Sequence, residues 1–230
     1  MTDDIKKNYS RRLFGLNKFI SKIIKSKRSE INKLIEKQLD YQKYKSLLDV
    51  GTTPSLADHE NQILNYFYKK INISCLSNLD LLELKTLYPE ILIHLGDARK
   101  MLFENNKFDV VISSATIEHV GSFENQLKFV SECYRVSKYK TFIATPNRYY
   151  PIEFHTKIPF LHYLPKLYHR KILRLLGENF LSLEENLNLL SEKDFLEICK
   201  MLKIQNFRIE KIKLFGLTSN YILIIDKKEN

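Results

Sequence analysis

Five short apolar segments that alternate with helix-type segments constrain the fold of this chain more than any other feature. These segments are predicted β-strands, and they lie at residues 47–51, 71–76, 91–95, 108–112 and 141–144. Helical spacing of apolar residues predicts helices between them, most clearly at residues 63–68 and 123–136. Strands that alternate with helices at this pitch are typical of βαβ units on a parallel sheet.

The last part of the chain follows a different pattern. Residues 191–202 are a predicted helix, and two β-rich segments follow at residues 207–214 and 220–225. Only a short loop that contains Gly216 separates them, and a parallel return would need a longer crossover, so the two strands must be antiparallel. We therefore predict an α/β fold with a mainly parallel, seven-stranded sheet whose last strand is antiparallel.

The N-terminal part is basic and amphipathic. Apolar residues recur at helical spacing from Leu13 to Ile24 and from Ile31 to Leu39, on either side of a basic segment at residues 25–28, which predicts two helices with a break between them. The formal net charge of +10 is concentrated in residues 1–45 and 146–177. Such basic segments are either solvated faces or surfaces for an anionic membrane, a nucleic acid or a phosphorylated substrate.

Composition limits the class of protein. A chain of 230 residues buries one sizeable core, so we expect one domain. No apolar run approaches the ~18 residues of a membrane-spanning helix. The three cysteines, which give no sign of a disulfide framework or a thiolate metal site, are Cys75, Cys133 and Cys199. The N-terminus lacks the pattern of a signal peptide, so we expect a cytoplasmic protein, at most peripheral at the inner membrane face.

The residues just after each predicted strand are the first candidates for a ligand site, because ligands of open parallel sheets bind beyond the carboxyl ends of the strands. The first loop, "DVGTTPS", has Gly51 for a tight turn but lacks the Gly-x-Gly-x-x-Gly spacing of a dinucleotide site. After the third strand, Asp97 is either a hydrogen-bond acceptor for an exocyclic amine or the N-cap of a helix. After the fourth strand, small residues around Ser114 leave room for a ligand.

The order of the segments "LLDVG", "GDARKMLFENNKFDVVISSATIEHVG" and "ATPNR", followed later by "ENLNLL", resembles class I S-adenosylmethionine-dependent methyltransferases of the type 11 group, over residues 47–225. The resemblance implies their Rossmann-like fold and S-adenosylmethionine as cofactor. It implies a cofactor site formed by Asp49, Gly51, Thr52, Asn78, Asp97, Ala98, Ser114 and Ala115. The family usually has an acidic residue after the second strand to bind the ribose. Here Ser77 and Asn78 stand there, so Asn78 or Asp80 binds the ribose, or the ribose is bound more weakly.

The segment after the fifth strand is a predicted lid. Prolines at four positions between residues 145 and 165 prevent a continuous helix, and several aromatic residues between them suit an irregular cover over a pocket. A basic amphipathic helix follows at residues 166–176. His155, His162 and His169 are spaced by seven residues, which matches no familiar zinc pattern, so we predict no metal.

These features predict methyl transfer to a small-molecule acceptor, with lipid- and sugar-linked acceptors included. His119 and His155 are the candidate catalytic residues, as bases for a weakly acidic hydroxyl; the alternative for His119 is a residue bonded to backbone at a helix start. A nucleic-acid substrate is disfavoured because "SSAT" replaces the motif that stacks a flipped base. The alternative of another class is a non-catalytic peripheral membrane or interaction protein with a degenerate nucleotide pocket.

We expect one methyltransferase domain over residues 1–230. Its predicted parts are basic N-terminal helices at 1–45, a cofactor-binding core at 46–145, a lid at 146–190, and a closing helix and hairpin at 191–230.

Overall fold

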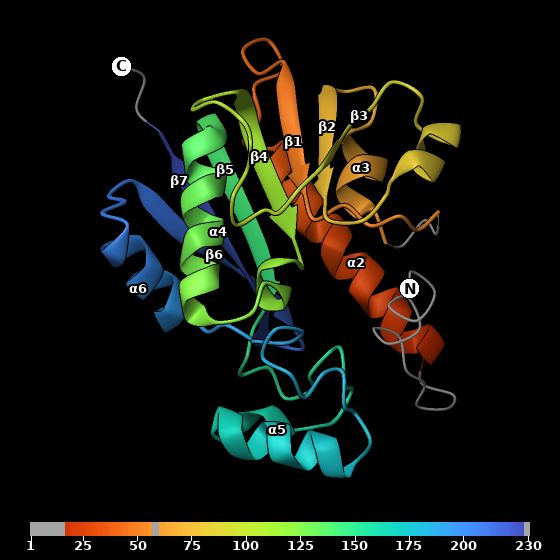
Figure 1. The fold of residues 1–230 in the computed structure, drawn as a ribbon, viewed down its shortest axis with the longest axis vertical. Coiled ribbons are helices and arrows are strands. Elements are labelled where there is room, and N and C mark those ends of the chain that lie inside the picture. Colours follow the sequence, from red (N-terminus) through yellow and green to blue (C-terminus); the bar gives the residue numbers. More distant parts are fainter. Residues whose placement is uncertain (1–16, 57–59, 228–230) are drawn as a thin grey trace.

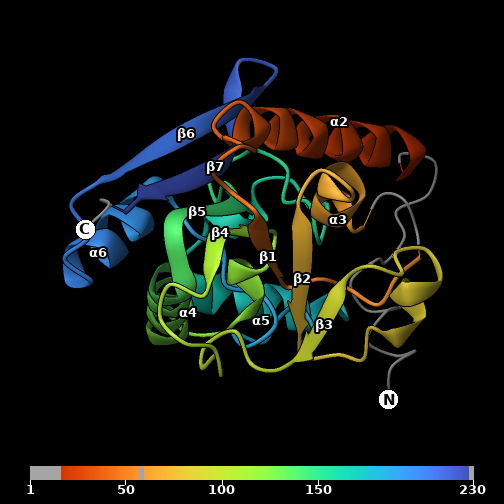
Figure 2. The ribbon, with the colours of Figure 1, turned by 90° about the horizontal axis from the view of Figure 1, so that it is seen from above.

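A computed structural model describes residues 17–56 and 60–227 and shows one seven-stranded sheet with helices on both faces (Figures 1 and 2). The strands are β1 (Ser46–Val50), β2 (Asn72–Ser77), β3 (Leu92–Leu95), β4 (Phe108–Ser114), β5 (Ser137–Pro146), β6 (Phe207–Leu214) and β7 (Leu217–Asp226). The α-helices are α2 (Asn17–Glu36), α3 (Gln62–Phe67), α4 (Phe123–Val136), α5 (Lys166–Leu175) and α6 (Glu192–Met201). Single 3-10 turns are η1 (Leu82–Thr86), η2 (Ile117–His119) and η3 (Leu161–Tyr163).

The strand order is β3-β2-β1-β4-β5-β7-β6. The pairs among β1 to β5 are parallel, whereas β7 is antiparallel to both β5 and β6. Strand order therefore reverses between β1 and β4, which places the ligand crevice beyond the carboxyl ends of these two strands. The predicted fold class is confirmed.

Both faces of the sheet are buried, which explains why the central strands are continuous apolar runs rather than alternating ones. Leu47 and Val110 pack with α2 and α3 on one face. Leu48 and Val111, the next residue in each strand, pack with α4 and α6 on the other face. Figure 2 shows these two helix layers on opposite sides of the sheet.

The prediction of two N-terminal helices is wrong for the described residues, because one helix, α2, runs through the basic segment without a break. Lysine and arginine are good helix formers, and Lys27 pairs with Glu30 one turn later (Nζ–Oε2 2.7 Å). Ile31 and Ile35 continue the same buried face. The predicted helical residues Leu13 and Leu16 lie outside the described residues.

Residues 147–190 form the irregular segment that the prolines predict, and α5 lies beyond the carboxyl ends of the strands, away from the helices that cover the sheet (Figure 1). This segment is attached to the core through Asn147 and Leu190, which form an isolated bridge, and through Arg148, whose backbone N–H donates to the Leu190 carbonyl (2.9 Å). The lid is thus fixed at both of its ends beside β5. Within the described residues, no helix has the length and apolar character needed to cross a membrane.

Candidate active site

The turn after β1 is packed directly against the turn after β4. Gly51 has φ +93°, and a Cβ there would lie 2.1 Å from Thr116 Oγ1. The Val50 carbonyl accepts hydrogen bonds from Ser113 Oγ (2.9 Å) and Thr116 Oγ1 (3.3 Å). Glycine is needed at position 51 both for the backbone conformation and for this close approach.

Asp49 is a buried carboxyl group at the end of β1, only 5 % exposed. Burial raises the pKa of Asp49 to about 7, and a hydrogen bond from Thr52 Oγ1 to Asp49 Oδ2 (3.0 Å) opposes that rise in part. Among the described residues, no lysine or arginine forms an ion pair with Asp49. A buried carboxyl group in this state suits a cationic ligand, since pairing would favour its charged form.

Asp97 follows β3 and is held by Arg99. The Arg99 guanidinium bonds both carboxylate oxygens of Asp97 (Nε–Oδ1 2.9 Å, Nη2–Oδ2 2.7 Å), and the backbone N–H of Arg99 donates to Oδ1 (2.8 Å). These bonds hold the pKa of Asp97 below its usual range, with the guanidinium bond as the largest cause. The alternative of Asp97 as a helix N-cap is wrong, because turns rather than a helix follow it.

Sequence reasoning missed Arg99, although its place two residues after a carboxylate was a usable signal. Its Nη1 also donates to the carbonyl of Val120 (3.3 Å), in the loop between η2 and α4. Arg99 therefore ties the end of β3 to the loop that follows β4. Ala98 is partly buried against the α4 side of the core.

The end of β2 carries the polar residues that stand where the family has an acid. Ser77 Oγ accepts the backbone N–H of Leu79 (3.2 Å), and Asn78 is exposed. Asp80 Oδ1 accepts the backbone N–H of Leu82 (2.9 Å), the first residue of η1. Asn78 and Asp80 are both exposed, so the choice between them as the ribose-binding residue stays open.

The end of β4 turns sharply toward β5. Ser114 is partly buried, and Ala115 has φ +56°, a conformation that a residue with a Cβ seldom adopts. The backbone N–H of Ala115 donates to the Ala144 carbonyl (2.9 Å), which keeps this turn against the end of β5. The turn leads into η2, which carries His119.

His119 and His155 meet at this rim, although they are far apart in the sequence. Their Nε2 atoms lie 3.1 Å apart, with the two rings nearly perpendicular at 84°. His119 Nδ1 donates to the Asn186 carbonyl (2.6 Å), and His155 Nδ1 donates to Glu153 Oε1 (2.5 Å). The structure thus brings together the two residues predicted as catalytic, and His119 also makes the backbone bond of the alternative interpretation.

The two imidazoles have different electrostatic surroundings. Burial lowers the pKa of His119, and the neighbouring His155 lowers it further. Burial also opposes the charged form of His155, but the Glu153 carboxylate outweighs it and raises the pKa of His155. Asymmetry of this kind in a pair of titratable groups is typical of functional sites.

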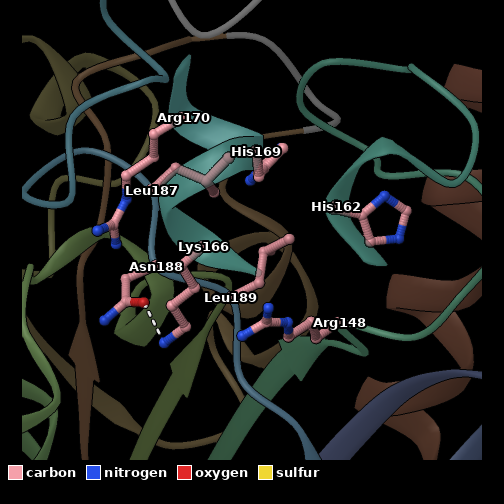
Figure 3. A pocket seen from close by; sticks show the side chains of 8 residues that line it. All are labelled: Arg148, His162, Lys166, His169, Arg170, Leu187, Asn188 and Leu189. Carbon is pink, nitrogen blue, oxygen red and sulfur yellow. Dashed lines mark hydrogen bonds between the residues drawn. The ribbon is translucent and has the colours of Figure 1, made fainter. Parts of the chain in front are cut away.

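The other two lid histidines lie apart from this pair, around a recess in the lid. His162, His169, Arg148, Lys166, Arg170 and three residues of the segment 187–189 line it (Figure 3). Lys166 Nζ donates to Asn188 Oδ1 (2.6 Å), and burial and the nearby Arg148 lower the pKa of Lys166. Arg170 is paired with Glu184 (Nη2–Oε1 2.9 Å), so the positive charge of the recess comes mainly from Arg148 and Lys166, and this charge favours an anionic ligand group.

The recess is joined to the histidine pair through Asn188. The backbone N–H of Asn188 donates to the Glu118 carbonyl (2.7 Å), and its Nδ2 donates to the Gly121 carbonyl (2.7 Å). The "ENLNLL" segment therefore has two structural roles: Asn186 orients His119, and Asn188 connects η2 to the basic recess.

Comparisons with known proteins agree with the fold described above. Residues 61–144 match a family model described as a methyltransferase domain. A comparison with curated protein sequences gives no significant match. Among solved structures, magnesium protoporphyrin IX methyltransferase from Synechocystis, crystallised with S-adenosylhomocysteine, has a TM-score of 0.61 at 10% identity, over 99% of this chain and 94% of that chain.

Two further structures show the same fold. A S-adenosylmethionine-dependent methyltransferase from Methanosarcina mazei has a TM-score of 0.57 at 14% identity, over 84% of this chain and 96% of that chain. The Burkholderia thailandensis 1,6-didemethyltoxoflavin-N1-methyltransferase has a TM-score of 0.59 at 7% identity, over 89% of this chain and 80% of that chain. At such identities the likeness establishes the fold.

The sheet order and the antiparallel β7 are those of the class I methyltransferase fold, and residues 61–144 match the methyltransferase-domain model. The solved structures named above are of methyltransferases, and two of them hold S-adenosylhomocysteine, so S-adenosylmethionine is the ligand to test against the rim residues. The residues at the rim fit this cofactor: Asp49 offers a buried carboxyl group for a cationic methionine part, and Gly51 lets the backbone turn away at the end of β1. This fit does not require the Gly-x-Gly-x-x-Gly loop of dinucleotide sites, which the sequence lacks.

Proposed function

We propose that this methyltransferase acts on a small-molecule acceptor that carries an anionic group, such as a phosphate-linked sugar or lipid. The observation that carries the proposal is the contact between His119 and His155 at the carboxyl end of β4, beside the basic recess in the lid. In the proposed cofactor site, Asp49, Gly51 and Thr52 lie along the methionine part, Asp97, Ala98 and Asn78 along the nucleoside, and Ser114 and Ala115 toward the acceptor.

S-adenosylmethionine supplies a methyl group on a sulfonium, which is already a good leaving group. The acceptor atom forms a bond to the methyl carbon while the carbon–sulfur bond breaks and its electron pair stays on sulfur; the acceptor's proton passes to a base or to water. The protein's task is to align the acceptor and exclude water. His119 supports the proton step, since its Nδ1 donates to Asn186 and its Nε2 therefore carries the lone pair.

The test of the function is methyl transfer from labelled S-adenosylmethionine to a panel of phosphate-linked and neutral hydroxyl acceptors. We expect His119→Gln to lower kcat by ~10²- to 10⁴-fold, the usual range for loss of a positioned base, with little change in the Kd of S-adenosylhomocysteine. Wild-type activity on neutral acceptors only would contradict the proposed substrate class.

The basic recess gives a second prediction, on acceptor binding. Lys166→Ala should raise the KM for a phosphate-linked acceptor by ~10-fold or more, because a charge-assisted hydrogen bond is worth roughly 1.5–3 kcal/mol. With a soluble acceptor and no membrane present, Lys171→Ala is the matched control, since Lys171 is on the same helix but exposed and outside the recess. Equal KM values for the two variants would remove the recess from the acceptor site.

We also propose that the outer face of α5 contacts an anionic membrane surface when the membrane carries such an acceptor. Leu167 (61 % exposed) and Leu175 (86 % exposed) lie two turns apart, and the exposed Lys171 lies between them. Exposed leucines beside basic residues are typical of interfacial helices.

In flotation with anionic liposomes at low salt, the wild type should rise with the vesicles, and the double variant Leu167→Asp/Leu175→Asp should not. Leu102→Asp, at a position 91 % exposed outside the lid, is the control; a wild type that stays in the bottom fraction would refute this contact.

A further inference from the structure

Three side chains with metal-binding atoms meet where β4 and β5 end. Glu118, His119 and His155 each offer one ligand atom, and these atoms lie within 4.8 Å of one another. Glu118 and His119 are adjacent in η2, and His155 comes from the lid. The cluster therefore exists only when the lid is folded against the core.

The two histidines are oriented as metal ligands usually are. Each Nδ1 donates to a fixed acceptor, the Asn186 carbonyl for His119 and the Glu153 carboxylate for His155. In a neutral imidazole this leaves the lone pair on Nε2, and the two Nε2 atoms face each other at 3.1 Å. Such outer hydrogen bonds to carbonyl and carboxylate groups are the standard support of metal-binding histidines.

The distance between the two nitrogens also suits a shared cation. With metal–nitrogen bonds of about 2.1 Å, two neighbouring ligand atoms lie roughly 3.0–3.4 Å apart, depending on the coordination geometry. Two facing lone pairs at this distance repel each other unless a proton or a cation lies between them.

The buried carboxylate of Glu118 is a second observation that favours a bound cation. Its side chain is 0 % exposed, and Oε2 accepts a hydrogen bond from Thr145 Oγ1 (2.9 Å). Oε1 is buried and has no hydrogen-bond partner among the described residues. A buried carboxylate oxygen without a partner is costly, and a cation is one way to satisfy it.

We propose that Glu118, His119 and His155 bind a divalent transition-metal cation at the acceptor side of the active site. Two imidazoles and one carboxylate with open positions suit zinc, manganese, iron(II) or cobalt better than magnesium or calcium. Glu153, behind His155, adds negative charge, whereas Arg28 lies close enough to Glu118 to act on it electrostatically and reduces the attraction for a cation. The sequence-based expectation of no metal rested on the spacing of the three lid histidines, of which the cluster uses only His155.

The proposal rests on the proposed function, because a cation at this place would polarise an acceptor hydroxyl. In that case the two imidazoles hold the cation instead of accepting the proton themselves, and the proton of the hydroxyl passes to water. Methyl transfer then needs no reactant beyond the cofactor and the acceptor.

Calorimetric titration of the metal-free full chain with ZnCl₂, MnCl₂ and CoCl₂ tests the site. We expect one cation per chain for at least one of the three salts. His119→Gln and His155→Gln should lose this binding, and Glu153→Gln should weaken it by ~10- to 100-fold, as is usual for outer-shell partners. His162→Gln, a lid histidine outside the cluster, is the matched control and should bind as the wild type does.

A second measurement needs no variant. Cu²⁺, which such sites bind most tightly, should show coupling to two imidazole nitrogens in the electron paramagnetic resonance spectrum of the wild type. Failure to bind any of the cations, equal binding by His119→Gln and His162→Gln, or a copper spectrum without two histidine nitrogens would each overturn the proposal. A parallel titration with S-adenosylhomocysteine separates the two claims: cofactor binding without metal binding refutes the metal site alone, and loss of cofactor binding refutes the proposed function.

Discussion

Asp49→Asn is expected to weaken S-adenosylmethionine binding by ~10- to 100-fold at pH 8, while the protein stays folded. Asparagine keeps the shape of the side chain and a hydrogen bond to Thr52, but it cannot pair as an anion with the ammonium group of the methionine part. The effect should appear in the Kd of both S-adenosylmethionine and S-adenosylhomocysteine, because both carry that ammonium group.

The same residue should make cofactor binding pH-dependent in the wild type. The pKa of Asp49 is raised by burial to about 7, so protonation below this pH removes the anion that the cofactor favours. The Kd should therefore rise as pH falls below about 7, by up to roughly tenfold per unit, and the Asp49→Asn variant should lack this slope. A wild-type Kd that is constant between pH 6 and 8 would contradict this assignment.

Protonation of Asp49 has opposite effects on binding and on stability: it weakens cofactor binding but stabilises the fold. Its folded-state pKa lies above its unfolded value, so its contribution to stability is full below about pH 4 and is lost as pH rises through about 7. In Asp49→Asn, the unfolding free energy from urea denaturation should fall less between these pH values than in the wild type. The variant would thus be at least as stable as the wild type at pH 8, which separates lost binding from lost folding.

Gly51→Ala is expected to abolish cofactor binding and to destabilise the fold by about 2–5 kcal/mol. The positive φ costs roughly 1–2 kcal/mol in a residue with a Cβ, and the collision with Thr116 adds a further ~1–3 kcal/mol of overpacking. The two turns that border the proposed cofactor site would have to separate.

Gly216→Ala is the matched control for this effect. Gly216 also has a positive φ, at +80°, but a Cβ there meets no atom within 4 Å. Its cost should be the backbone strain alone, with an unchanged Kd for S-adenosylhomocysteine. Thermal unfolding of both variants measures the loss of stability, and calorimetry measures the Kd of S-adenosylhomocysteine. Equal losses of stability would show that the contact with Thr116 is unimportant.

The order of the elements could be predicted because it depends on local patterns. Strands β1, β4 and β5 are buried on both faces and are read from short apolar runs, and helix α4 has a regular apolar face and a serine N-cap, Ser122. The error in α2 came from interpreting charge as a break, whereas helix formation depends on backbone and propensity, which lysine and arginine satisfy.

The candidate site was predictable only in part, because its decisive contacts join residues far apart in the chain. His119 and His155 were each singled out from their places after strands, but nothing local indicated that their rings touch. The partner of His119 is a backbone carbonyl, that of Asn186, and a carbonyl carries no signal in the side-chain sequence. The irregular lid, which supplies His155 and the basic recess, follows no period from which contacts can be inferred.

The central claim is that S-adenosylmethionine binds across the carboxyl ends of the parallel strands, between the turn after β1 and the end of β3. A crystal structure of the full chain with S-adenosylhomocysteine tests it most directly. We expect the methionine part against Asp49 and Gly51, and the adenine beside Asp97 and Ala98. Ligand bound elsewhere, or a rim filled by side chains of the protein while the ligand is present at saturating concentration, would contradict the account.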